Sequence, residues 1–290
     1  MWQAIKKAIE KDSSFFLMAP AVVWQALFFM IPLVLVVSLS FFLECEHSLF
    51  SQLSLQNFKT ILLWPQFCII VRSLVLASVT AFGTLLFAYP AAYFIAQHVV
   101  KFKTFFIFLL SIPFLINLLV QVYSWYFILE KYGVLNKTLQ SLGLIHESQD
   151  LLSGKFAVFL VMFHVYLPFM LMPIYSILEK LDKRYIEASS DLGASWFETF
   201  THVILPLSMP GIRSGFFLVL VTSFGEYVIP ALLGGMKQFY VGTLISEYFF
   251  IGKEWHVGAA FIVFSCICLL VTIAVYNWLF NKITLRSRNI

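Results

Sequence analysis

The chain has 290 residues, of which 61% are hydrophobic and 12% charged, and its formal net charge is +4. A soluble domain is usually nearer half apolar and a quarter charged, so a water-soluble globular protein is excluded and the solvent must be lipid. The net charge is too small to indicate a nucleic-acid-binding protein.

Long uncharged runs predict six membrane-spanning helices, because about 20 apolar residues cross a bilayer core of roughly 30 Å. In chain order the runs are 13–43, 73–100, 104–129, 156–178, 214–236 and 255–281. The fifth run is long enough but contains the acidic residue Glu226. The runs are continuous rather than alternating, which favours helices over a barrel. The expected fold class is therefore an all-α polytopic membrane protein.

The N-terminal part divides into a basic stretch and a long first span. Residues 1–12 place apolar side chains at helical spacing, so we expect them to lie along the cytoplasmic membrane surface, although a frayed basic tail fits equally well. The next run is too long for the apolar core of a cleavable signal peptide and predicts a retained helix. Residues 13–67 are then this helix and its outer loop. Cys45 and Cys68 could pair there if that side is oxidising.

The distribution of basic residues sets the expected orientation. With the N-terminus inside, the cytoplasmic segments carry more of the 19 Lys and Arg residues than the outer segments, as the positive-inside rule requires. Both termini are therefore expected in the cytoplasm. The same count places the connection between the fourth and fifth spans on the cytoplasmic side.

That connection begins with a polar segment that predicts a short helix. Asp182 is a suitable N-cap for a helix over Lys183–Leu192, and Gly193 is suited to the position after its end. A ten-residue helix is marginal alone in water, so this one must pack against its own bundle or another protein. An interfacial elbow that merely joins two spans is the alternative.

A second helix is expected to lead back to the membrane. Ser195 and Glu198 have the spacing of a capping box, in which each side chain satisfies a backbone donor of the other. This helix should run to about Leu205. Pro206 and Pro210 are then expected to bend the chain before the fifth span.

Common catalytic and metal-binding motifs are missing from the sequence. It contains no G-x-x-x-x-G-K-[ST] phosphate loop, no H-E-x-x-H zinc motif, no G-x-S-x-G nucleophile motif and no paired C-x-x-C. The 6 His residues are scattered over both faces and several helices. We therefore expect no catalytic or metal site and no bound cofactor in this chain.

The polar connection resembles the EAA signature of ABC-importer permeases, which reads E-A-A, three residues, G, nine residues, I-x-L-P. The matching residues are Glu187-Ala188-Ser189, Gly193 and Val203-Ile204-Leu205-Pro206, at the same spacing. Ser189 stands in place of Ala and Val203 in place of Ile. The position in a cytoplasmic loop before the penultimate span makes the match specific.

Other segments narrow the resemblance to the membrane subunits of spermidine/putrescine importers. The similar segments are 113–129, 167–183, 191–195, 205–212, 225–235 and 253–261, and the likeness extends from about Cys68 to the C-terminus. Gln121 stands where that pattern has Arg. The resemblance implies a type I ABC-importer (MetI-like) permease bundle over residues 68–290, in the bacterial inner membrane, with a coupling helix around 183–193.

The resemblance also implies partners. Such a chain is a transporter subunit rather than an enzyme, working with a second permease subunit, two copies of a cytoplasmic ABC ATPase that binds ATP and Mg, and an external substrate-binding protein. Its EAA segment would dock in a groove of the ATPase, whose closure would rock the attached spans. The expected coupling residues are Glu187, Ala188, Ser189, Asp191, Gly193, Ala194, Leu205 and Pro206.

A polyamine is a flexible cation, so its path should offer carboxylates and aromatic faces. Glu226 is the leading candidate, because an ionisable residue inside a span is costly and indicates function. Alternatively, Glu226 caps a helix break before Pro230 or pairs with Arg72. The other expected path residues are Tyr227, Tyr123 and Trp125.

Two alternatives remain at this point. Permeases for ferric iron, thiamine or phosphonate share the same plan and would differ only in cargo. A stand-alone secondary transporter or channel belongs to a different class. The lack of detectable inverted repeats and the single strong intramembrane charge count against it.

Overall fold

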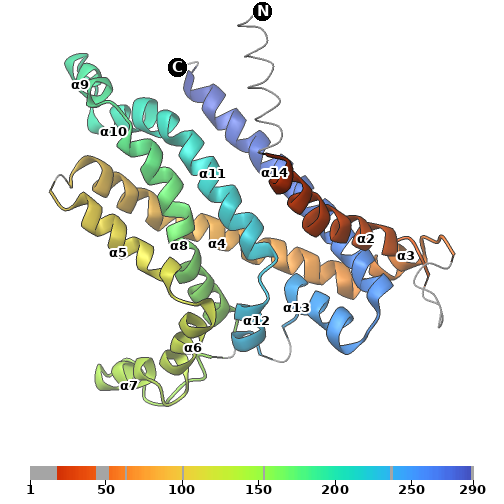
Figure 1. Cartoon of the computed structure of the whole chain (residues 1–290). Coiled ribbons are helices and arrows are strands. Elements are labelled where there is room, and N and C mark those ends of the chain that lie inside the picture. The colour runs from red at the N-terminus through yellow and green to blue at the C-terminus, as the bar shows by residue number, and fades with distance from the viewer. Residues whose placement is uncertain are drawn as a thin grey trace, which may run out of the picture. The chain divides into compact units, whose positions relative to one another are not determined.

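The computed structural model describes residues 18–43, 52–62, 64–99, 101–152, 154–235 and 238–288, with side chains up to residue 282 (Figure 1). In chain order the elements are η1 (Ala26–Met30), α2 (Ile31–Leu39), α3 (Gln56–Ile61), α4 (Trp64–Gln97), α5 (Lys103–Leu115), α6 (Leu118–Leu129), α7 (Val134–Ser141), α8 (Lys155–Glu179), α9 (Lys183–Asp191), α10 (Trp196–Thr199), η2 (Phe200–Ile204), α11 (Leu205–Phe224), α12 (Val228–Leu233), α13 (Val241–Ser246), η3 (Glu247–Ile251) and α14 (Trp255–Arg288), where η marks a π-helix.

Within the described ranges the regular structure is helical, and the β contact found there is one isolated antiparallel bridge, between Phe42 and Leu53. Five of the helices found there are long and apolar enough to cross a membrane, or six if the bent pair α5 and α6–α7 is one span. This confirms the expected all-α membrane protein. The expected surface helix at residues 1–12 and the Cys45–Cys68 pair fall wholly or partly outside the described residues.

The chain divides into two compact units, residues 1–64 with 247–265 and residues 65–246 with 266–290. In the first unit, the apolar helix Met18–Leu39 is the predicted first span, and none of its most apolar stretch is buried. The Asn57 side chain donates to the backbone carbonyl oxygens of Ser40 at 3.2 Å and Phe42 at 2.8 Å. The expected domain division after residues 12 and 67 stays a prediction.

The second unit is built on the long helices α4, α8 and α11, and α8 packs most extensively against α11 (Figure 1). Two glycines on α11, one helical turn apart, allow this close packing. A Cβ on Gly211 would lie 2.8 Å from the Pro173 carbonyl oxygen, and one on Gly215 would lie 2.9 Å from that of Met170. Small residues at this spacing let two membrane helices approach backbone to backbone.

Gly215→Ala should therefore destabilise the second unit, because overpacking a close helix contact costs about 1–3 kcal/mol. Gly154→Ala is the matched control, since a Cβ there would meet its nearest atom at 3.9 Å. Thermal unfolding of the purified protein in detergent should show a lower Tm for Gly215→Ala than for Gly154→Ala. Equal values would contradict the packing argument.

The predicted third span is not one straight helix. It is broken at Ile116–Asn117, and the two halves meet at 91°. The Ile116 backbone is extended, and the Asn117 side chain accepts a hydrogen bond from the Leu119 amide at 2.9 Å, so it caps the start of α6. A hydropathy scan counts apolar residues and cannot detect such a cap within an apolar run.

The predicted fifth span, 214–236, is also wrong in its bounds. The spanning helix runs from Trp196 to Phe224, and the chain breaks at Gly225 before α12 begins. The helix of this span continues without a break through Pro206 and Pro210, where a bend was expected. Pro206 falls in the first turn of α11, where a missing N–H is tolerated, and the wider π-turns of η2 precede it.

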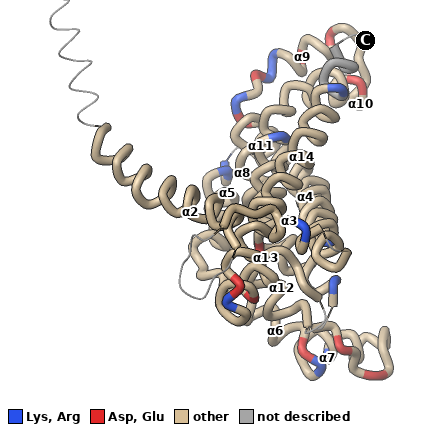
Figure 2. Tube along the Cα trace, turned by 90° about the vertical axis from the view of Figure 1, so that its right-hand side faces the viewer, with Lys and Arg blue, Asp and Glu red and all other residues tan. Residues whose placement is uncertain are grey.

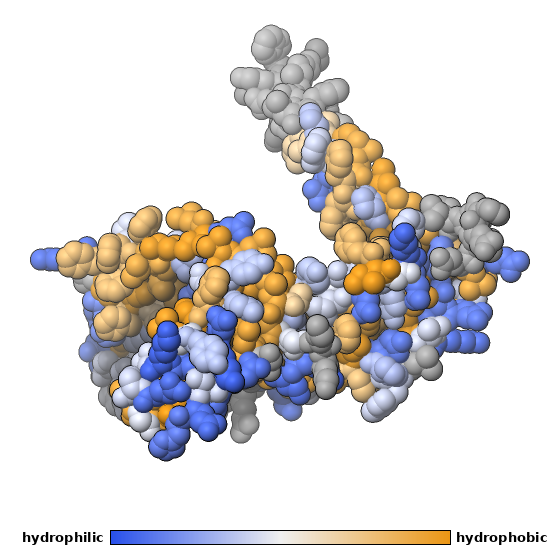
Figure 3. All heavy atoms as spheres, turned by 90° about the horizontal axis from the view of Figure 1, so that it is seen from below, coloured by the Kyte–Doolittle hydropathy of each residue, from blue (hydrophilic) through white to orange (hydrophobic). Residues whose placement is uncertain are grey.

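Charged residues of the second unit gather at its two ends. Figure 2 shows Lys, Arg, Asp and Glu around α9 and α10 at one end and around α7 at the other. Seen from the α7 end, hydrophilic atoms collect over α7 and its neighbouring loop, and apolar atoms adjoin them (Figure 3). This distribution fits a bundle whose middle lies in lipid.

Candidate functional site

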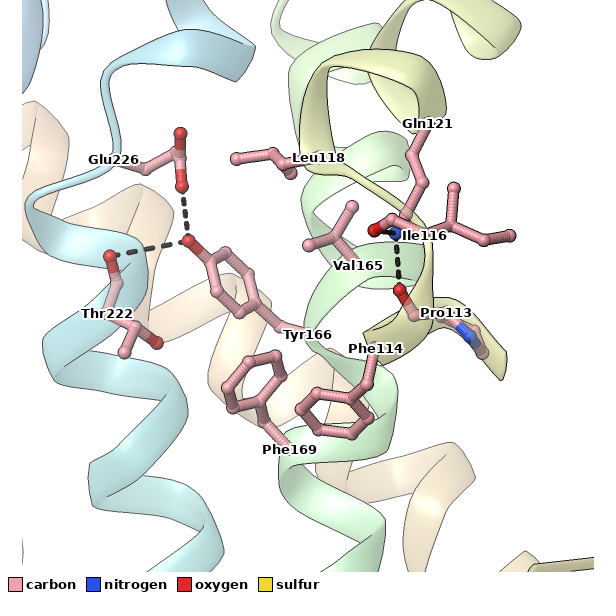
Figure 4. Close-up of a pocket in the computed structure, with 10 residues that line it drawn as sticks. All are labelled: Pro113, Phe114, Ile116, Leu118, Gln121, Val165, Tyr166, Phe169, Thr222 and Glu226. Carbon is pink, nitrogen blue, oxygen red and sulfur yellow. Dashed lines mark hydrogen bonds between the residues drawn. The ribbon is translucent and has the colours of Figure 1, made fainter. Parts of the chain in front are cut away.

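A pocket of about 500 Å³ lies in the second unit, between the two helix breaks and the middle of α8 (Figure 4). Three stretches of chain line it: the α5–α6 break, one face of α8, and the C-terminal end of α11 with the residues that follow. The lining residues are Pro113, Phe114, Ile116, Leu118, Gln121, Val165, Tyr166, Phe169, Thr222 and Glu226.

Glu226 supplies a carboxylate to the wall of this pocket. It lies in the break between α11 and α12 rather than inside a helical span, which corrects its predicted setting. One oxygen accepts the backbone amide of Val228 at 2.9 Å, and the other accepts the hydroxyl of Tyr166 (Figure 4). Glu226 therefore caps the start of α12, as expected if it served only to cap a helix break before Pro230. It also faces the pocket. The described residues show no ion pair between Glu226 and Arg72.

Gln121 holds the opposite break together. Its side-chain amide nitrogen donates to the carbonyl oxygens of Pro113 at 2.6 Å and Ile116 at 3.0 Å, replacing backbone donors that the broken helix lacks (Figure 4). Its side-chain oxygen is buried and has no hydrogen-bond partner within the described part of the chain. Gln121 thus leaves one unused acceptor at a pocket-lining residue.

Aromatic rings cover much of the remaining wall. Phe114 and Phe169 pack with ring centroids 4.5 Å apart, and Phe169 also contacts Tyr166 at 5.8 Å. A carboxylate and aromatic faces together suit an organic cation with an aliphatic chain, which needs a counter-charge and apolar contact at once.

The structure brings one of the four expected path residues to the pocket. Glu226 lines it, whereas Tyr123, Trp125 and Tyr227 do not. Tyr123 and Tyr227 are exposed, and Trp125 contacts the ring of His164. The aromatic wall could not be predicted from the sequence. The chain contains 33 Phe, so a Phe or Tyr that lines a pocket cannot be told apart from one that packs between helices.

The predicted coupling segment lies between the C-terminal end of α8 and the start of α11. Asp182 caps α9 by accepting the amide of Arg184 at 3.0 Å, as predicted. The helix has nine residues rather than ten, because Leu192 is its C-cap. Gly193 follows with φ +81°, a left-handed conformation that favours glycine.

The capping box that starts the second helix is also confirmed. The Ser195 amide donates to the Glu198 carboxylate at 2.7 Å, and the Glu198 amide donates to the Ser195 hydroxyl at 3.4 Å. A hydrogen bond of 2.8 Å between the hydroxyls of Ser189 and Thr199 ties α9 to α10. The corner is therefore fixed by side chains on both of its arms.

The expected coupling residues fall into two groups. Glu187, Ala188, Asp191 and Gly193 are exposed at the tip. Ser189, Ala194, Leu205 and Pro206 are half-buried and belong to the support of the tip.

Apolar side chains that the sequence analysis did not select are exposed beside this tip. Leu192 is 89% exposed, Trp196 66% and Phe197 67%. So many exposed apolar side chains next to charged residues mark a surface that a partner or the lipid interface covers. No local sequence signal distinguishes them from the apolar residues of a span.

The chain is similar to known transport proteins. Residues 90–286 match the family described as "binding-protein-dependent transport system inner membrane component". The spermidine/putrescine transport system permease protein PotB of Haemophilus influenzae is 34% identical over 264 residues, covering 89% of this chain and 92% of that protein. PotB of Escherichia coli is 34% identical over 254 residues, covering 87% of this chain and 92% of its own length.

A solved structure shares the fold. The crystal structure of a bacterial ABC transporter involved in the import of the acidic polysaccharide alginate matches with a TM-score of 0.75 and 17% identity, covering 97% of this chain and 99% of that chain. This match confirms the ABC-importer permease fold that the resemblance implied.

Proposed function

This chain belongs to the family of binding-protein-dependent transport system inner membrane components, and we propose that it is a permease subunit of an ATP-driven importer of polyamines. The observation that carries the cargo assignment is the pocket in which the Glu226 carboxylate stands beside the aromatic rings of Tyr166 and Phe169. The names of the PotB relatives point to the same cargo class.

The electrostatics of the pocket favour a cation over an anion. An ammonium group can take the Glu226 carboxylate as its counter-ion, and the methylene chain can lie along the rings. An anionic cargo such as phosphonate would meet the same carboxylate with like charge.

The coupling segment supports the proposed energy source. We assign the exposed tip, with Glu187, Ala188 and Gly193, to a groove on a cytoplasmic ATPase present in two copies, which would bind the ATP and Mg. The α8–α11 pair continues directly from this tip to the pocket, since Tyr166 lies on α8 and Thr222 on α11. A movement of the tip would therefore reach the pocket as a rigid-body movement of two packed helices.

The full proposed assembly adds a second permease subunit and an external binding protein, in the bacterial inner membrane with both termini in the cytoplasm. A transporter subunit of this design needs no enzyme site of its own. One similar solved structure is a bacterial alginate ABC transporter in complex with an alginate pentasaccharide-bound periplasmic protein, which supports the binding protein of the proposed assembly.

Reconstitution tests the proposal. The chain should be co-purified with the ATPase, second permease and binding protein of its assembly and placed in proteoliposomes. Uptake of radiolabelled putrescine and spermidine should require ATP, and an ATPase variant lacking its phosphate-loop Lys should abolish uptake. Equal uptake without a functional ATPase would indicate a channel or secondary transporter, and ATP-driven uptake of another cargo alone would overturn the polyamine assignment.

A further inference from the structure

We propose that Gly242, on the short helix α13, is a positioning residue that holds the backbone of Glu226 in place at the pocket. This inference rests on the proposed function, in which the Glu226 carboxylate meets the cationic cargo. Gly242 does not line the pocket itself, so it acts through Glu226.

Gly242 packs directly against the peptide that carries Glu226. A Cβ built on Gly242 would lie 2.6 Å from the carbonyl oxygen of Glu226, 2.9 Å from its carbonyl carbon and 2.9 Å from the carbonyl oxygen of Gly225. These are backbone atoms, which cannot rotate away as the end of a flexible side chain can. A residue larger than glycine must therefore separate α13 from the Glu226 segment.

Helix α13 is anchored and cannot easily be the part that moves. The amide of Val241, its first residue, donates to the hydroxyl of Ser73 on α4 at 2.9 Å, and Ser73 is only 2% exposed. Tyr240 and Val241 are buried as well. Gly225, in the break between α11 and α12, is exposed, so the backbone of the break has room to shift and a Cβ at position 242 displaces Glu226.

Two sets of contacts then define where the carboxylate stands. Its oxygens are held by the Tyr166 hydroxyl and by the amide of Val228, and its backbone is held by Gly242. Displacing the backbone moves the carboxylate away from Tyr166 and the aromatic wall. The cargo then loses a charge-assisted contact while the rest of the pocket stays intact.

Gly242→Ala, measured in the reconstituted importer, should raise KM for putrescine about tenfold with a small change in Vmax, as loss of one charge-assisted contact predicts. Gly225→Ala is the matched control in the same segment. Its φ of −87° is open to any residue, and a Cβ there meets nothing within 4 Å. Gly225→Ala should keep the wild-type KM, and an unchanged KM in Gly242→Ala would overturn the proposal.

A double-variant cycle separates positioning from general damage. In a Glu226→Gln background, Gly242→Ala should raise KM no further, because the charge that it displaces is already gone. A full additional increase would overturn the positioning role while leaving Glu226 in the path. An unchanged KM in Glu226→Gln alone would overturn the path assignment as well, so the two failures can be told apart.

Ser73 offers a milder variant if Gly242→Ala does not assemble. Ser73→Ala removes the hydroxyl that anchors α13, so KM should rise severalfold. Ser73→Thr retains the hydroxyl and should restore KM towards the wild-type value. A rise in Ser73→Ala that persists in the Glu226→Gln background would also overturn the proposal.

Discussion

Gly193→Asp should abolish ATP-driven uptake while leaving the chain folded and inserted. Gly193 has φ +81°, and Asp is among the residues that tolerate this left-handed conformation. A Cβ on Gly193 meets nothing within 4 Å in this chain, so any loss reports a docked partner. An unpaired charge closed into an interface costs about 3 kcal/mol, which corresponds to a loss on the order of 100-fold in uptake and in substrate-stimulated ATP hydrolysis.

Gly143→Asp is the matched control for this prediction. Gly143 follows α7 with φ +71°, and a Cβ there also meets nothing within 4 Å. The substitution therefore has the same local cost and adds the same charge, but at the far end of the second unit. Uptake should stay near the wild-type rate. Normal uptake in Gly193→Asp, or equal losses in the two variants, would contradict the coupling role.

In the proposed coupling, the packing of α8 against α11 would carry a movement of the tip to the pocket. Gly211 and Gly215 bring the two backbones together, so the helices pack closely along this contact. The tip joins the C-terminal end of α8 to the helix that continues into α11, and the middle of α8 and the C-terminal end of α11 line the pocket. The proposed coupling between the tip and the pocket therefore needs only the packed α8–α11 pair to move as a unit, without a series of side-chain rearrangements.

Local features of the fold were predictable from the sequence. The presence of apolar spans follows from composition, although the bounds of the third and fifth do not, and the caps at Asp182 and Ser195–Glu198 follow from side chains that bond to backbone within three residues. The corner at Gly193 follows because glycine suits a left-handed residue after a helix. These interactions depend on near neighbours in the chain, so their sequence patterns are specific.

The pocket could not be predicted, because long-range contacts and helix breaks create it. Tyr166 meets Glu226 across 60 residues, and Gly242 meets Glu226 across an intervening helix. The breaks at Ile116–Asn117 and Gly225 lie inside apolar runs that a hydropathy count reads as continuous. The intramembrane charge at Glu226 was the one feature of this site that stood out against its surroundings.

Glu226→Gln should raise KM for putrescine and spermidine about tenfold or more in the reconstituted importer. Gln keeps the size of the side chain and an oxygen that can accept the Val228 amide, so the cap of α12 survives. Its amide can also donate to the Tyr166 hydroxyl, which keeps the pocket wall together. The change therefore removes mainly the negative charge, and a charge-assisted contact contributes about 1.5–3 kcal/mol. Initial uptake rates over a range of cargo concentrations measure the effect.

Glu130→Gln and Tyr166→Phe separate a charge in the pocket from charge or packing elsewhere. Glu130 is exposed at the end of α6 and does not line the pocket, so its neutralisation changes net charge equally and should leave KM unchanged. Tyr166→Phe removes the hydroxyl and its contacts with Glu226 and the Thr222 carbonyl oxygen but keeps the carboxylate and the ring, so its increase in KM should be smaller than that of Glu226→Gln. If Glu226→Gln transports both polyamines with wild-type kinetics, the carboxylate serves only to cap α12 and the cargo passes elsewhere.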